Sequence, residues 1–184
     1  MDGTLVTTTL DFAQIRRNMG LTPDQGILEA ISEMPQAQQE RATQYLLSQE
    51  LESAKQAQLL PGAADIVSKT QANGLRCALL TRNTRRAADI VLRKFESLKF
   101  DLVRCREDGV IKPEPDGIFQ ACGTLGIDPT KTICVGDFEY DIDAANSAGA
   151  VSVLLTTSPD WQNFAHKADY IINSMDQLAQ IANI

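Results

Sequence analysis

The sequence predicts an α/β protein in which a parallel sheet is covered by helices on both faces. From Pro61 onward, short apolar runs alternate with helix-like segments, which is typical of such a sheet. Polar residues stand directly after two of the apolar runs, at Thr81 and Asp137, and functional side chains gather at the carboxyl ends of parallel strands. A chain of 184 residues is long enough for one well-buried core and a small inserted lobe.

Each element of the core can be placed by its hydrophobic pattern and its boundary residues. Pro61 and Gly62 open a helix that Gly74 ends, and the apolar run that follows ends at Thr81. The expected strands cover about residues 75–80, 100–104, 132–135, 151–155 and 170–172, and the helices between them cover about residues 84–97 and 114–125.

The stretch from residue 10 to residue 60 differs from the rest of the chain. It is rich in Gln, Glu and Ala and has almost no β-branched runs. Phe12, Ile15 and Met19 recur at helical spacing, which gives a helix with one apolar stripe. We therefore predict a small helical cap at residues 10–60, inserted into an α/β core that comprises residues 1–9 and 61–184.

The composition narrows the classes of function. Apolar residues make up 43% of the chain and charged residues 22%, and no apolar run approaches the roughly 20 residues that span a bilayer. The net charge of -7 and the pI near 4.7 disfavour a nucleic-acid partner, because proteins that bind the phosphate backbone usually present a basic surface. No secretory leader pattern precedes the first motif, so we expect a cytoplasmic protein without a membrane partner. The 4 cysteines include no CxxC pair, which argues against a zinc site.

Short polar motifs follow one another along the chain. They are Met1-Asp2-Gly3-Thr4, Leu79-Leu80-Thr81-Arg82-Asn83, Lys112-Pro113-Glu114-Pro115 and Val135-Gly136-Asp137, with Asp141 following. In this order the motifs resemble those of the haloacid dehalogenase superfamily, in particular phosphoglycolate phosphatase-like members with a helical cap. The resemblance spans about residues 1–155 and implies a Rossmann-like core.

The resemblance also implies an activity and a set of site residues. It implies a Mg2+-dependent hydrolase of a small phosphorylated metabolite that works through an aspartyl-phosphate. Asp2 would protonate the leaving oxygen and then activate water, with Thr81 and Lys112 as the other catalytic residues. The substrate would be bound by Gly3, Thr81, Arg82, Asn83 and Lys112, and the metal by Asp2, Asp137 and Asp141.

Each of these residues also has a structural interpretation. Thr81 could cap a helix, Lys112 could be a surface lysine, and Asp137 and Asp141 could be acids at a helix start. The order in which the motifs occur favours the catalytic interpretation.

The first aspartate of the family's DxDGT motif has no position in this sequence. Met1 matches the variable middle residue of that motif, so the nucleophile and the first strand of the core would precede Met1. We therefore expect a start codon assigned too late, and we expect the chain as written to be inactive. Loss of that strand would expose two strand edges.

Two other functions remain open. A short form without the nucleophile would bind a phosphate ligand or a partner without turnover. A phosphomutase would use the same residues, because the cap decides whether water or a sugar hydroxyl attacks. A receiver domain is disfavoured because its acidic pair precedes its Thr and Lys, whereas Asp137 and Asp141 follow both here. The sequence predicts neither the substrate nor the oligomeric state.

Overall fold

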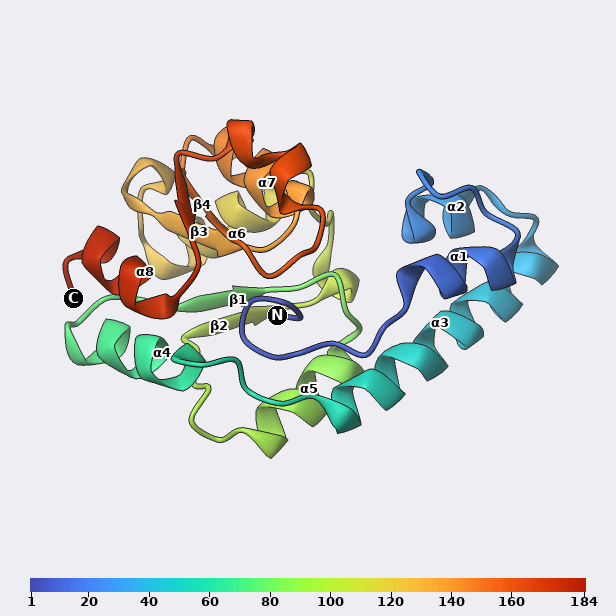
Figure 1. Ribbon diagram of the computed structural model, residues 1–184, viewed down its shortest axis with the longest axis horizontal. Coiled ribbons are helices and arrows are strands. Elements are labelled where there is room, and N and C mark those ends of the chain that lie inside the picture. The colour runs from blue at the N-terminus through green and yellow to red at the C-terminus, as the bar shows by residue number, and fades with distance from the viewer.

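A computed structural model describes residues 1–184, and its strands form two parallel sheets (Figure 1). In one sheet, β1 (Ala78–Leu80) pairs with β2 (Leu102–Arg104). In the other, β4 (Val151–Leu155) lies between β3 (Ile133–Gly136) and β5 (Tyr170–Ile172). The predicted α/β class with parallel strands is confirmed.

Helices cover both faces of the sheets. They are α4 (Ala63–Ala72), α5 (Arg85–Lys94), α6 (Asp116–Leu125), α7 (Glu139–Ala148) and α8 (Met175–Ala182). Leu79 belongs to the main core, which includes residues of α4, α5 and α8, whereas Leu80 packs against the smaller core of α6 and α7. Because successive side chains of a strand point to opposite faces, the two cores lie on opposite sides of β1.

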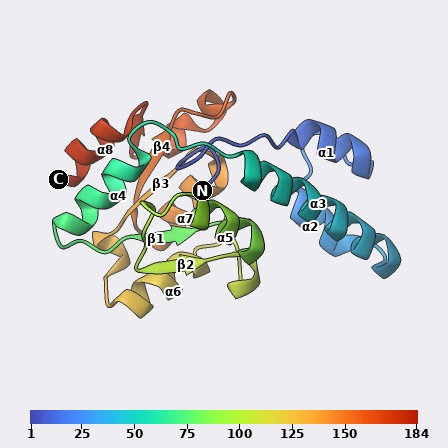
Figure 2. The ribbon, with the colours of Figure 1, turned by 90° about the horizontal axis from the view of Figure 1, so that it is seen from below.

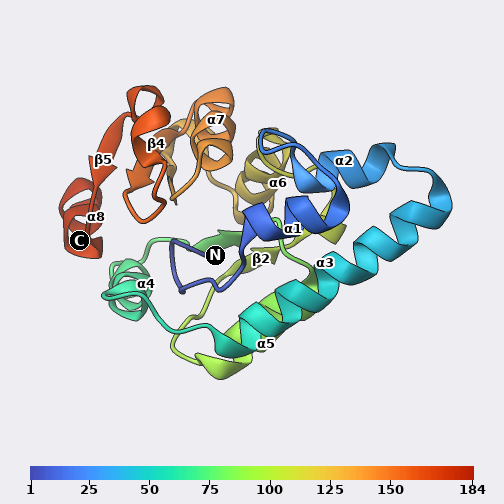
Figure 3. The same ribbon diagram turned by 45° about the vertical axis from the view of Figure 1, so that its right-hand side comes forward.

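Residues 10–60 form three helices that extend away from the sheets. These are α1 (Phe12–Met19), α2 (Ile27–Glu33) and α3 (Gln36–Gln56), and α1 and α2 lie beside the outer half of α3 (Figure 3). A small apolar core of their own holds them together, made of Ile15, Ile27, Ile31 and Leu46. The other half of α3 runs along α5 (Figure 1), so this helix ties the lobe to the core.

The predicted strand bounds agree with the structure for β4 and β5, but β1 is shorter than predicted. Leu75 is 46% exposed, and the amide of Cys77 donates to the side chain of Asp101 at 2.8 Å instead of joining a strand ladder. The apolar run 75–80 predicts one buried strand, yet the Asp101 side chain takes the Cys77 amide and the strand begins only at Ala78. The last helix, α8, was not predicted.

A gap separates the two sheets. β1 and β3 are both edge strands, and they border a cavity of about 340 Å³ that is lined mostly by apolar side chains. The amino terminus lies between the two sheets (Figures 1 and 2). No helix of the chain is both long and apolar enough to cross a membrane.

Candidate active site

The first six residues form a tight loop at the end of the gap between the sheets. The amide of Leu5 donates to the carbonyl of Met1 and the amide of Gly3 to the carbonyl of Val6, both at 2.8 Å. Gly3 has a φ of 67°, and a Cβ at this position would lie 2.1 Å from Oδ2 of Asp137. A glycine is therefore needed both for the turn and for the close approach of the loop to Asp137.

Thr4 connects this loop to the end of β3. Its side chain is 5% exposed, and its Oγ1 donates to Oδ1 of Asp137 at 2.8 Å. Burial and the neighbouring carboxylate of Asp141 raise the pKa of Asp137 to about 6. The loop and the strand end thus share one polar contact in a largely buried place.

Lys112 and Asp141 form a partly buried ion pair in the site. Nζ of Lys112 lies 2.5 Å from Oδ1 of Asp141 and donates to the carbonyl of Leu80 at 3.0 Å. Burial alone would raise the pKa of Asp141, but the Lys112 ammonium, the α-amino group of Met1 and the hydrogen bonds from Lys112 and the Phe138 amide together hold the pKa below its usual value. Gly136 leaves room for this pair, because a Cβ there would lie 2.1 Å from Cγ of Asp141.

The end of β1 supplies Thr81 and Asn83. The amide of Asn83 donates to Oγ1 of Thr81 at 3.2 Å, and Nδ2 of Asn83 donates to Oδ2 of Asp2 at 2.5 Å. The bond from Asn83 holds the Asp2 carboxylate at the end of β1. It uses Oδ2 of Asp2 and does not involve Oδ1. Thr81 itself is 7% exposed.

Arg82 joins the core to the helical lobe. Its guanidinium donates to the carbonyl of Lys112 at 2.8 Å, pairs with Glu29 of α2 at 2.6 Å and lies 4.3 Å from the centre of the Tyr140 ring. Arg82 is therefore held on three sides beside the loop that carries Lys112. No sequence pattern marks Glu29 or Tyr140 as a neighbour of the site.

A second ion pair between lobe and core was also not predicted. Glu50 of α3 is 6% exposed and pairs with Arg106 at 2.6 Å, while its Oε2 has no hydrogen-bond partner. Burial raises the pKa of Glu50. Nothing in the Gln- and Glu-rich sequence of α3 distinguishes Glu50 from the exposed acids around it.

The predicted metal ligands are only partly brought together. Asp137 and Asp141 are close neighbours, whereas Asp2 is turned toward Asn83, and the structure contains no group of three or more His, Cys, Asp or Glu side chains arranged around one point. The α-amino group of Met1 lies near all three carboxylates. Carboxylate oxygens suit a hard cation, so the donor chemistry fits Mg2+, while an octahedral ligand set requires several further oxygens.

The sequence of the chain matches a known family of hydrolases. The sequence profile of the haloacid dehalogenase-like hydrolases matches residues 1–149. The chain belongs to this family of hydrolases.

Similar proteins agree with this assignment. A haloacid dehalogenase-like hydrolase domain-containing protein of Arabidopsis thaliana is 27% identical over 198 residues, covering 98% of this chain and 80% of the relative. A phosphoglycolate phosphatase of Escherichia coli O157:H7 is 30% identical over 160 residues, covering 85% of this chain and 61% of the relative. Among solved structures, a haloacid dehalogenase-like protein of Bacteroides fragilis superposes with a TM-score of 0.79 at 21% identity, covering 97% of this chain and 96% of the other.

Proposed function

We propose that this chain carries the site of a Mg2+-dependent phosphomonoesterase that acts on a small phosphorylated metabolite through an aspartyl-phosphate. The observation that supports this most strongly is that Asp2, Asp137, Asp141 and Lys112 all lie near the α-amino group of Met1. The similarity to a phosphoglycolate phosphatase supports a phosphate ester as the substrate.

Each residue of the site would have a distinct part in this reaction. The hydroxyl of Thr81 and the amides that follow it would bind the phosphoryl oxygens, and the Lys112 ammonium would offset their charge. Asp2, oriented by Asn83, would give a proton to the leaving oxygen and later take one from the attacking water. Arg82 would contact the remainder of the substrate, since it lies where the lobe meets the core.

The nucleophile is the one part that this sequence does not supply. We propose that it is an aspartate directly before Met1, because the α-amino group of Met1 lies among Lys112 and the three carboxylates of the site. When bound, Mg2+ would neutralise the carboxylates and the phosphate, and Asp137 and Asp141 would take part in holding it.

The test compares three forms of the protein with p-nitrophenyl phosphate and Mg2+. The chain as given should release no phosphate, whereas a form extended upstream of Met1 by an apolar strand ending in Asp should turn over. The same extension ending in Asn is the matched control and should be inactive. Turnover by the given chain, or equal turnover by the Asp and Asn forms, would refute the assignment of the nucleophile. Transfer of phosphate to a sugar phosphate in preference to water would indicate a mutase instead.

A further inference from the structure

The helical lobe and the core border a groove beside the candidate active site. The groove has a volume of about 490 Å³ and lies between α2 and the segment of residues 109–114, which carries Lys112. Glu29 of α2 lines the groove and pairs with Arg82, the residue that follows Thr81 in the chain. The groove therefore adjoins the end of β1, where the phosphoryl group is expected to bind.

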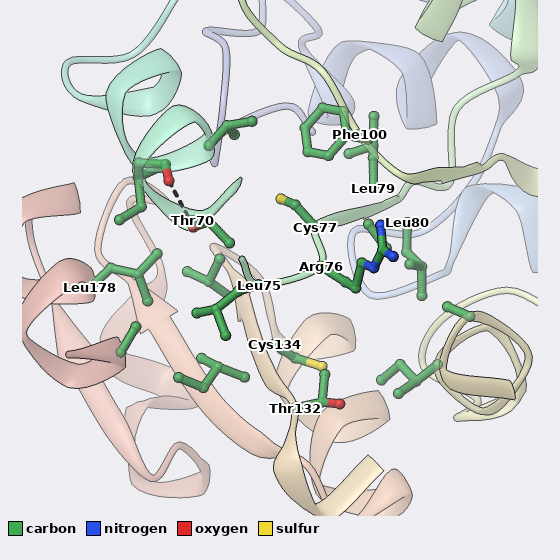
Figure 4. A pocket seen from close by; sticks show the side chains of 18 of the residues that line it. Thr70, Leu75, Arg76, Cys77, Leu79, Leu80, Phe100, Thr132, Cys134 and Leu178 are labelled. Carbon is green, nitrogen blue, oxygen red and sulfur yellow. Dashed lines mark hydrogen bonds between the residues drawn. The ribbon is translucent and has the colours of Figure 1, made fainter. Parts of the chain in front are cut away.

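The groove suits the polar remainder of a metabolite better than the cavity between β1 and β3 does. That cavity is lined mostly by apolar side chains, and Figure 4 shows Cys77 and Cys134 among them. The lining of the groove instead includes the charged residues Glu29, Arg106 and Glu114. Selectivity for the remainder of the substrate should therefore depend on these charges.

The two arginines at the groove are already paired with carboxylates of the lobe. Arg82 lies 2.6 Å from Glu29, and Arg106 lies 2.6 Å from the buried Glu50. Arg82 is also held by a backbone carbonyl and by an aromatic ring, so its guanidinium is fixed in this position. An acidic group of a substrate would therefore meet no free guanidinium in the groove.

The carboxylates of the groove are less completely neutralised. Glu114 lines it and forms no ion pair. The side chain of Glu29 is 48% exposed although it pairs with Arg82. A second anionic group on a substrate would lie beside these carboxylates, and like charges a few ångströms apart repel each other even in water.

Gly26 makes room for the Glu29 carboxylate. It directly precedes α2 with a φ of -65°, which other residues adopt as readily, so the backbone does not require a glycine here. A Cβ at this position would lie 2.2 Å from Oε2 and 2.9 Å from Cδ of Glu29. The missing side chain of Gly26 thus lets the carboxylate lie against the start of α2 while it pairs with Arg82.

We propose that Glu29, positioned by Gly26 and assisted by Glu114, makes the site selective against phosphate esters whose remainder carries a second anionic group. The substrate is then a phosphate monoester of an uncharged or cationic alcohol, whose hydroxyl or ammonium groups can donate to these carboxylates. Glu29 determines specificity and takes no part in phosphoryl transfer. This inference rests on the proposed function, because it names the class of ester that the phosphatase site accepts.

The experiment measures the binding of two phosphonates to the full chain in the presence of Mg2+ by isothermal titration calorimetry. One is 3-phosphonopropionate, which carries a carboxylate, and the other is 3-phosphonopropanamide, which carries a neutral carboxamide of the same shape. Both have a carbon–phosphorus bond in place of the ester, so neither can be hydrolysed. The chain should bind the amide at least about tenfold more tightly than the acid, the scale of a contact between like charges. Equal affinities, or a preference for the acid, would overturn the proposal.

Three substitutions assign this preference to Glu29. In Glu29→Gln the preference for the amide should fall below about threefold. In Gly26→Ala it should also fall, because the carboxylate keeps its charge but is displaced by the added Cβ. Glu33→Gln is the matched control and should keep the preference of the parent, because Glu33 is an exposed acid on the same helix without an ion pair.

The variants also separate this inference from the proposed function. The inference is wrong if Glu29→Gln or Gly26→Ala keeps the full preference, or if Glu33→Gln loses as much of it as Glu29→Gln. Binding of both phosphonates without any preference would overturn the inference and leave the proposed function standing. Binding of neither phosphonate by any of the four forms would refute the proposed function, and the inference with it.

Discussion

Removal of the Lys112 ammonium should destabilise the protein at neutral pH. In Lys112→Met, the Asp141 carboxylate would lose an ion pair of 2.5 Å between side chains that are 16% and 17% exposed. Breaking a buried pair from one side costs about 3–5 kcal/mol, and the residual exposure places this case near about 3 kcal/mol. Loss of the bond to the Leu80 carbonyl adds to the effect.

The pH dependence gives this prediction a second test. In the parent chain the pKa of Asp141 is lowered, so its contribution to stability is present above its unfolded pKa and is lost as the pH falls through the folded pKa. Without Lys112, burial would raise the pKa of Asp141 against fewer opposing groups, and the folded variant would take up a proton at a higher pH. The loss in free energy of unfolding of Lys112→Met relative to the parent should therefore be largest at pH 7 and become smaller toward pH 5.

Urea unfolding at both pH values, without divalent metal, measures this deficit. Lys69→Met is the control, because Lys69 is exposed on α4 and forms no ion pair. The reasoning is refuted if the free energy of unfolding of Lys112→Met at pH 7 lies within about 1 kcal/mol of that of the parent. A loss of that size is what an exposed ion pair usually contributes.

Substitutions of Gly3 and Thr4, each with a matched control, test the loop of residues 1–6 by urea unfolding. Gly3→Ala should lower the free energy of unfolding by about 3 kcal/mol, because the position has a positive φ and a Cβ there would lie 2.1 Å from Asp137. The control Gly20→Ala should lower it by only about 1 kcal/mol, because Gly20 has a similar φ of 70° but open space around it. Equal costs for the two would show that the loop does not approach Asp137. Thr4→Val should cost about 1–2 kcal/mol by removing the donor to Asp137, and Thr4→Ser should retain most of the stability; a Ser variant as unstable as the Val variant would contradict the hydrogen bond.

Sequence patterns were sufficient for most of the α/β core. The runs that became β4 and β5 are apolar and end at turn residues, and both were predicted at their observed bounds. Such patterns can be seen in the sequence of the segment itself, because they depend on which of its own residues are apolar. The shortened β1 was not predictable in the same way, because the Asp101 side chain that ends the pairing at Cys77 comes from a distant segment.

Some residues of the candidate site could be predicted from local sequence, whereas others depend on contacts between distant segments. Thr81 and Asp137 each follow an apolar run that forms a parallel strand, so their positions at strand ends could be expected from sequence. Glu29 and Glu50 could not be identified, since their contacts with Arg82 and Arg106 depend on how the helical lobe lies against the core. Their charges alone are indistinguishable from those of a solvated helix face.

The charges of the site explain why a divalent cation would be needed if the proposed function is correct and an aspartate precedes Met1. The α-amino group of Met1 and the Lys112 ammonium are the cations close to Asp2, Asp137 and Asp141. A peptide bond at Met1 would remove the first of these cations, and the proposed aspartate would add a fourth carboxylate. One ammonium would then face four carboxylates in a largely buried place, which would repel a phosphate ester. Under the proposed function, binding of the substrate would therefore require a cation of higher charge, which Asp137 and Asp141 would hold.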